Sequence, residues 1–195
     1  MKGSVVSNQP SNSTTKNVNT LCTHHFCING EFNFNSILQH LDIQDWKEVN
    51  LNSSFDWNYL NAAKDNNDIK FVLTESIKNW TYLLWNVTEF EVSSQMATYL
   101  SEQLETRVSY FYIDPWVAVC SWAISDRGTL IQSYDESHGE VLTSFGDNPD
   151  VVEFWEDKFW NAYERTAQPI DELNKLKAIK CAIGEKIQLT PHHSS

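Results

Sequence analysis

Glycine is scarce in this sequence, which has six glycines in 195 residues. That share is about 3%, against a usual share of ~7%. No pair of these glycines fits the G-x-G-x-x-G fingerprint or a P-loop, and both motifs need glycine where the backbone approaches a phosphate group. The sequence therefore argues against the common types of nucleotide-binding enzyme.

Basic residues are also few. Fourteen lysines and arginines stand against 26 aspartates and glutamates, which gives a formal net charge of −12. Nucleic-acid phosphates repel a protein of this charge unless a local basic patch overrides the repulsion. We therefore expect a protein partner and no nucleic acid.

Long apolar runs are missing from the chain. No stretch approaches the ~18 apolar residues that a membrane-spanning helix needs. The N-terminal segment also lacks the apolar core of a secretory signal peptide. Both observations predict a cytoplasmic protein that has no membrane partner.

Cysteine occurs four times, and the expected cytoplasmic location favours free thiols over disulfides. Cys120 lies in an apolar run, and Cys181 lies on the apolar stripe of a predicted helix. We expect both to be small buried side chains, because free cysteine packs as a small apolar residue.

One short segment gathers several potential zinc ligands, namely Cys22, His24, His25 and Cys27. Its C-x4-C spacing lies at the edge of the usual zinc-knuckle range. No C-x-x-C or H-x3–5-H motif follows that would complete a familiar zinc site. We interpret the segment as a strand or loop that enters the domain, with Phe26 and Cys27 buried and the two histidines exposed. We expect no metal and no cofactor, with metal binding by this segment as the open alternative.

The first twenty residues carry Lys2 and Lys16 as their only charges and are otherwise rich in serine, asparagine and threonine. Such a segment cannot bury enough surface to offset its chain entropy. With ~150 residues per domain as a guide, the sequence predicts a disordered tail at residues 1–20 and a single domain at residues 21–190.

The domain has ample material for a core, since 13% of the residues are aromatic and eight are tryptophan. Short runs of β-branched and aromatic residues predict strands at residues 69–74, 80–87, 108–113, 116–124, 129–135 and 139–145. Turns such as Asp126-Arg127-Gly128 are too short for crossover helices, so we expect antiparallel pairing. The predicted fold class is α+β: an antiparallel meander of four to five strands with helices packed on one face.

Apolar residues at helical spacing predict helices at residues 36–41, 93–107, 149–166 and 169–184. Ser36 is the expected N-cap of the first helix. The last helix is predicted from Leu173, Leu176 and Ile179, with Gly184 as its stop signal.

The first candidate site consists of Asp135, Glu136, His138 and Glu140. A histidine beside carboxylates can serve acid/base chemistry because its ring titrates near neutral pH. The same residue types are favoured in a polar loop between two strands. We expect the three carboxylates to contact a partner protein, and we keep an acid/base site around His138 as the alternative.

The second candidate site is acidic. Between Asp147 and Glu172, eight acidic residues stand against Lys158 and Arg165. A solvated helix face accounts for this pattern, while the functional interpretation is a surface complementary to a basic partner, which speeds association. The residues expected to make this contact are Asp147, Asp150, Glu153, Glu156 and Asp157.

Aromatic residues supply a third candidate. Trp116 and Trp122 lie at one face of a predicted strand, and Tyr110 and Tyr112 alternate on its neighbour. If helices leave one face of the sheet uncovered, these side chains form an aromatic binding surface, and otherwise they pack in the core. Trp116 is the aromatic residue that we expect in the partner contact.

The middle of the chain carries a series of short motifs: Leu100-Ser101, Tyr110-Phe111, Trp122-Ala123, Gly128-x-Leu130-Ile131 with Tyr134, and Gly139-Glu140. Over residues 69–153 they resemble a small, largely uncharacterised family of bacterial proteins that is similar to the immunity proteins of polymorphic toxin systems. This chain differs from the family at Gln132, where the family tends to have arginine, and at Asp147, which replaces a glutamate. The resemblance implies a toxin inhibitor and assigns no catalytic residue.

These observations predict a non-enzymatic cytoplasmic binding protein, an immunity protein that neutralises a cognate toxin by direct binding. A basic toxin suits the negative charge of the chain. Two alternatives stay open: a small enzyme with an acid/base site around His138, and an interaction module that acts through the N-terminal tail. A deep pocket around His138 would favour the enzyme. The oligomeric state is left open.

Overall fold

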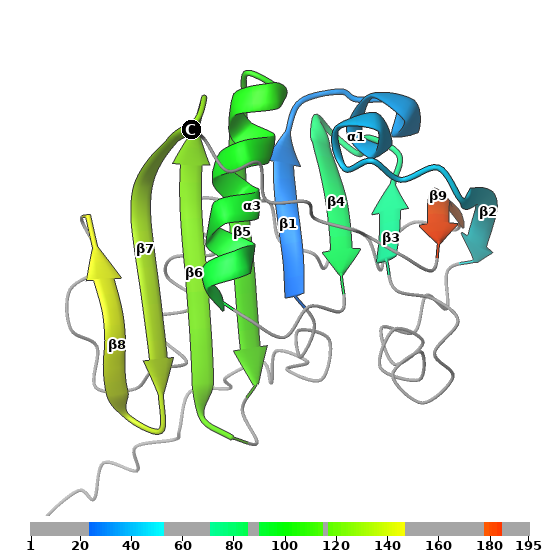
Figure 1. Ribbon diagram of the computed structural model, residues 1–195. Coiled ribbons are helices and arrows are strands. Elements are labelled where there is room, and N and C mark those ends of the chain that lie inside the picture. The colour runs from blue at the N-terminus through cyan, green and yellow to red at the C-terminus, as the bar shows by residue number, and fades with distance from the viewer. Residues whose placement is uncertain (1–23, 53–70, 86–89, 115–116, 147–177, 185–195) are drawn as a thin grey trace, which may run out of the picture.

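The computed structural model describes residues 24–52, 71–85, 90–114, 117–146 and 178–184. Within these ranges the chain forms one nine-stranded sheet in the order β2-β9-β3-β4-β1-β5-β6-β7-β8, and each pair of neighbouring strands is antiparallel. Figure 1 shows β8 and β2 at the two outer edges and both helices in front of the sheet. The α+β class is confirmed, but the prediction of four to five strands is wrong.

The strands are β1 (His24–Asn29), β2 (Trp46–Asn52), β3 (Phe71–Thr74), β4 (Trp80–Trp85), β5 (Arg107–Asp114), β6 (Val119–Asp126), β7 (Thr129–Ser137), β8 (Glu140–Phe145) and β9 (Ala178–Gly184). The helices are α1 (Phe34–His40) and α3 (Phe90–Gln103). None of the helices in these described ranges is both long and apolar enough to cross a membrane.

The meander predicted from the sequence is the half of the sheet from β5 to β8. Consecutive strands pair there, from Arg107 opposite Asp126 to Ser133 opposite Phe145. At the β6–β7 turn, Arg127 and Gly128 both have positive φ, at 47° and 80°. Two such residues form the tight hairpin turn whose twist matches that of the flanking strands. The local sequence therefore determines this half of the sheet.

The other half of the sheet brings together segments that lie far apart in the sequence. β1 lies between β4 and β5, and β9 lies between β2 and β3. The helix predicted at residues 169–184 is wrong at its C-terminal end, because Ala178–Gly184 is a strand. Cys181, Ala182 and Ile183 are all buried. A strand that is buried on both faces carries consecutive apolar residues, and periodicity alone does not distinguish such a run from a segment of a buried helix.

Helix α1 begins earlier than predicted. Its N-cap is Asn33, whose side-chain oxygen accepts a hydrogen bond from the Ser36 backbone N–H at 2.9 Å. Ser36 therefore lies in the first turn and is not the cap. Helix α1 buries Phe34, Ile37 and Leu38 against the sheet.

Helix α3 ends at Gln103, four residues before the predicted end. Glu105 has φ of 49°, and its N–H donates to the Glu102 carbonyl while the Thr106 N–H donates to the Ser101 carbonyl. These two bonds form a Schellman motif, which satisfies carbonyls that the last turn of a helix leaves free. The chain can then enter β5 directly at Arg107.

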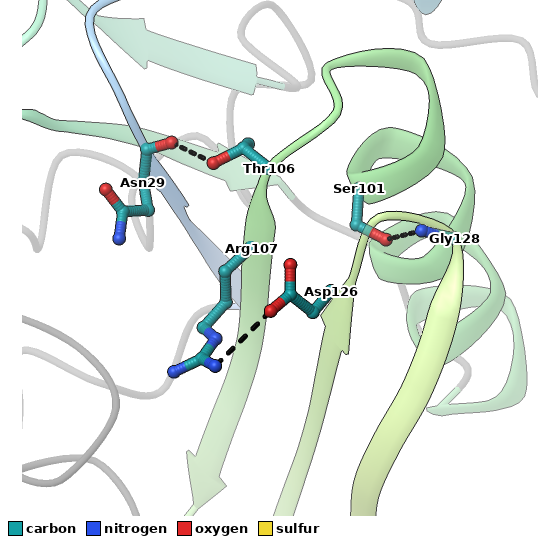
Figure 2. Close-up of polar contacts among 6 residues, drawn as sticks. All are labelled: Asn29, Ser101, Thr106, Arg107, Asp126 and Gly128. Carbon is teal, nitrogen blue, oxygen red and sulfur yellow. Dashed lines mark hydrogen bonds and ion pairs between the residues drawn. The ribbon is translucent and has the colours of Figure 1, made fainter.

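Polar contacts attach the end of α3 to the sheet, as Figure 2 shows. The Thr106 hydroxyl donates to the Asn29 carbonyl at 2.5 Å, and the Gly128 N–H donates to Ser101 Oγ at 2.9 Å. The Arg107 guanidinium lies 3.4 Å from the Asp126 carboxylate on the neighbouring strand. The helix end, β1 and the β6–β7 turn are thereby held together.

The sheet is buried on both faces at its centre. On the face that carries α1 and α3, here called the helix face, Phe26, Leu83 and Tyr110 are in register and belong to one core cluster with both helices. On the opposite face, Phe111 and Trp122 are in register and fully buried. The prediction that helices pack on one face holds for α1 and α3, the helices of the described ranges.

Several predicted features lie outside the described residues. They are the tail at residues 1–20, the helix at residues 149–166 and the N-terminal part of the helix predicted at residues 169–184.

Candidate protein-interaction surface

The β7–β8 hairpin forms one edge of the sheet. Its turn consists of His138 and Gly139, with φ of 53° and 82°. β7 continues through Ser137, so the polar loop expected between the strands is reduced to these two residues. Two residues with positive φ make a tight hairpin turn. Asp135 and Glu136 therefore lie in a strand, and their side chains point to opposite faces.

The three carboxylates of the first candidate site have different environments. Asp135 is half-buried and accepts a hydrogen bond from the Ser121 hydroxyl at 2.6 Å. Glu136 is only 6% exposed and accepts a hydrogen bond from the Tyr134 hydroxyl. Glu140 is exposed. Burial removes Glu136 from the surface available to a partner, whereas Glu140 stays accessible.

His138 lies at the exposed turn of the hairpin. Its Nδ1 atom is 2.8 Å from the Ser137 hydroxyl. The groove found beside the hairpin has a volume of about 310 Å³ and lies between α3 and β7, where it is lined by Ser94, Gln95, Thr98, Tyr99, Glu102 and Leu130. His138 does not line this groove, and an exposed turn is not the deep pocket that would favour the enzyme alternative.

The remaining predicted contact residues, Asp147, Asp150, Glu153, Glu156, Asp157 and Trp116, lie outside the described residues.

Exposed apolar side chains are the feature of this hairpin that the sequence analysis missed. Within the described ranges the large hydrophobic residues that are exposed are Val117, Ile131, Val141, Leu142 and Phe145, and all but Val117 belong to the hairpin. The exposed fractions of these four range from 41% to 57%. The apolar residues of β8 are visible in the sequence, but their exposure follows from the position of β8 at the edge, which the sequence does not state.

The segment with potential zinc ligands is strand β1. Because side chains alternate along a strand, His24 and His25 point to opposite faces of the sheet, and Cys27 lies on the same face as His25. The prediction that both histidines are exposed is wrong, since they are 9% and 1% exposed. Among the described residues, no group of three or more potential ligands could hold a metal ion, and Cys22 lies outside them.

His24 lies in an aromatic environment on the helix face. Its Nδ1 atom is 2.7 Å from the Tyr110 hydroxyl, and its ring stacks on Tyr112 with centroids 4.2 Å apart. Burial raises the pKa of the Tyr110 hydroxyl, a hydrogen bond with Ser93 lowers it, and the negative charge of Asp135 is among the lesser causes that raise it. These contacts make His24 part of the packed interior.

The predicted aromatic binding surface does not form from the residues that the structure describes. Tyr110 and Trp122 are fully buried and lie on opposite faces, because Trp122 is in register with Phe111. Trp122 stacks on Tyr134 with centroids 4.4 Å apart and an interplanar angle of 16°. These aromatic side chains are therefore core residues, as the alternative interpretation predicted.

Among the described residues, Cys27, Cys120 and Cys181 are buried thiols. Burial raises the pKa of the Cys181 thiol from its usual value of 9.0 to about 12, with the negative charge of Glu75 as a lesser cause. Burial alone raises the pKa of Cys27 even further. Cys27 and Cys181 are therefore expected to be neutral at pH 9, where an exposed thiol is at least about half ionised.

Alkylation tests this burial, because the thiolate is the form that reacts. We expect iodoacetamide at pH 9 to leave all three buried thiols unmodified in the native protein, as measured by peptide mass spectrometry. The denatured protein at the same pH is the control, and all three cysteines should react there. Rapid modification of Cys27 in the native protein would show that β1 is not a central strand.

The hairpin surface is defined here as Ile131, Val141, Leu142 and Phe145 together with Asp135 and Glu140 of the same hairpin. It combines exposed apolar side chains with carboxylates, and protein interfaces have an apolar core surrounded by a polar rim. Comparisons of the chain with protein-family models, with curated proteins and with solved structures found no match.

Proposed function

We propose that this chain is a non-enzymatic binding protein that neutralises a cognate basic toxin by covering it with the hairpin surface. The observation that carries the proposal is the concentration of four exposed apolar side chains on one hairpin. Large apolar side chains that stay exposed are available for burial against another macromolecule. Burial of such side chains supplies much of the affinity of an interface.

Charge supports a basic partner. The chain has a formal net charge of −12, and Glu140 is exposed next to the apolar residues of β8. Opposite fields accelerate the encounter of two proteins, and charges at the rim of an interface help to select the partner. The acidic residues at positions 147–157 follow β8 directly in the sequence and would add to this field.

The resemblance to the immunity-type family supports a toxin as the partner. Its motifs include Leu130-Ile131 and Gly139-Glu140, which belong to the β7–β8 hairpin. A toxin that acts on nucleic acid needs a basic surface, because it must bind phosphates. An acidic inhibitor can cover that surface and exclude the substrate.

Co-expression with the protein encoded by the adjacent gene tests the proposal. We expect this neighbour to stop growth when expressed alone and to be harmless when expressed with the present chain. Purified samples should form a complex whose association rate falls about tenfold or more as salt is raised, because salt screens charge attraction. Glu140→Lys should slow association, and Glu31→Lys is the matched control with the same charge change at an exposed position outside the hairpin.

Three results would contradict the proposal. The first is no binding to the neighbour, and the second is neutralisation that depends on His138 but not on Glu140. The third is loss of neutralisation on deletion of residues 1–20, which would assign the activity to the N-terminal tail.

A further inference from the structure

The first strand of the hairpin, β7, contains a β-bulge that supplies an exposed apolar residue. Leu130 and Gln132 pair with consecutive residues of β6, so Ile131 between them is an extra residue. Ile131 is 41% exposed. A bulge interrupts the alternation of a strand and can turn a side chain in a new direction, and bulges are frequent beside functional sites. The β7 bulge therefore places a large aliphatic side chain at the surface.

The second strand of the hairpin, β8, repeats this arrangement. Val141 and Thr143 pair with consecutive residues of β7, so Leu142 is the extra residue of a second bulge. Leu142 is 57% exposed, which is the largest fraction among the exposed large hydrophobic residues of the described ranges. Each of the two bulges thus presents one large aliphatic side chain to solvent.

We infer that Ile131 and Leu142 are the apolar anchors of the contact with the basic partner, and that the two bulges direct them toward it. This inference rests on the proposed function and specifies which residues of the hairpin surface supply the affinity. A few residues usually account for most of the affinity of an interface. Leu142 lies opposite the step from Asp135 to Glu136, which is about 15 Å along the hairpin from Ile131 at ~3.4 Å per residue. An interface of standard size, with about 800 Å² buried per partner, reaches both anchors.

The backbone around the β7 bulge is closely packed. Gly146, which follows β8, has φ of 77°, and a Cβ atom at this position would overlap the carbonyl oxygen of Ile131. The chain that leaves β8 therefore passes directly against the bulge, and this contact fixes the backbone from which the Ile131 side chain projects. An anchor that is already in place in the free protein loses less freedom when the partner binds.

Hydrogen bonds hold β7 at the point where the β8 bulge lies against it. The register between the two strands shifts between Asp135 and Glu136. Asp135 accepts a hydrogen bond from the Ser121 hydroxyl at 2.6 Å. Glu136 accepts one from the Tyr134 hydroxyl. Leu142 therefore projects from a strand whose neighbour is itself held in place.

The charges of the hairpin suit a basic protein. Residues 129–145 include Asp135, Glu136 and Glu140 and contain no lysine or arginine. Glu140 is exposed, so it can pair with basic side chains at the rim while apolar groups of the partner cover the anchors. A second copy of this chain fits less well, because each copy carries a formal net charge of −12 and the two would repel one another.

Truncation of the anchors tests the inference, with the adjacent-gene protein as the probe and the full chain as its binding partner. We expect the dissociation constant to rise at least about tenfold in Ile131→Ala and in Leu142→Ala. Leu142→Met keeps an apolar side chain of similar size and should bind like wild type. Val49→Ala removes an aliphatic side chain from β2, at the other edge of the sheet (Figure 1), and should leave binding unchanged.

Deletion of Val141 tests the bulge itself. Leu142 would then pair with Glu136 in regular register, so the leucine stays in the hairpin while the bulge that directs it is lost. We expect this deletion to weaken binding more than Val141→Ala, which removes the same valine side chain and keeps the bulge. Circular dichroism checks the fold of each variant. If the deletion variant does not fold, the alanine variants still test the anchors, because their side chains are exposed in the free protein.

The outcomes separate this inference from the proposed function. If the adjacent-gene protein binds wild type, Ile131→Ala and Leu142→Ala equally, the anchors are wrong, while the proposed function stands with its contact elsewhere on the hairpin surface. If it does not bind wild type at all, the proposed function is wrong and the inference falls with it. If the Val141 deletion and Val141→Ala bind equally, the bulge does not direct the anchor. If wild type forms a dimer that Leu142→Ala dissociates, the anchors bind a second copy, and a basic partner at this site is excluded.

Discussion

Replacement of Phe26 by alanine is expected to lower the free energy of unfolding by about 3–5 kcal/mol. Phe26 is fully buried at the centre of the helix face, on a strand that lies between β4 and β5. Its ring centroid is 5.2 Å from that of Tyr110 and 6.3 Å from that of Trp85. The substitution leaves a cavity among rings that cannot close together without moving whole strands.

Urea unfolding measures this effect, with Leu142→Ala as the control. Leu142 is 57% exposed on the edge strand, so its truncation should change stability by less than about 0.5 kcal/mol. If Phe26→Ala does not fold, Phe26→Leu keeps most of the volume and should cost about 1 kcal/mol. Equal effects at Phe26 and Leu142 would contradict the central position of β1.

The expected loss at Phe26 depends on a pairing that local sequence patterns do not reveal. From β5 to β8, consecutive strands pair with one another. A short turn motif in the sequence is therefore enough to predict both the strands and their pairing. β1 instead pairs with β4 and β5, whose residues follow it by dozens of positions. Five consecutive residues of β1 are buried, so the alternation that identifies a half-exposed strand is missing.

The candidate site was predictable only in part for a similar reason. The sequence identified the hairpin that carries Asp135, Glu136 and Glu140, and the structure confirms that this segment forms a hairpin. The sequence could not show that Glu136 is buried beside Tyr134, because burial depends on which face of the sheet is covered. The exposure of Val141 and Phe145 likewise depends on β8 being the last strand.

Gly184 provides the second large expected effect, and it distinguishes the observed strand from the predicted helix. A Cβ atom at this position would lie 2.6 Å from the Asp45 carbonyl oxygen and 2.6 Å from the ring of Phe71. Phe71 is fully buried and in register with Gly184. The ring occupies the space that a side chain would need, so we expect Gly184→Ala to destabilise the protein by about 1–3 kcal/mol through overpacking.

A double-mutant cycle with Phe71→Leu isolates this contact. The smaller leucine leaves room for the new methyl group, so Gly184→Ala should cost less in the Phe71→Leu background than in wild type. The difference is the coupling free energy, which for residues in contact is about 0.5–3 kcal/mol. If Gly184 instead followed the end of a helix, Phe71 would not affect the cost of the substitution. Zero coupling, measured by urea unfolding of the four proteins, would therefore contradict the pairing of β9 with β3.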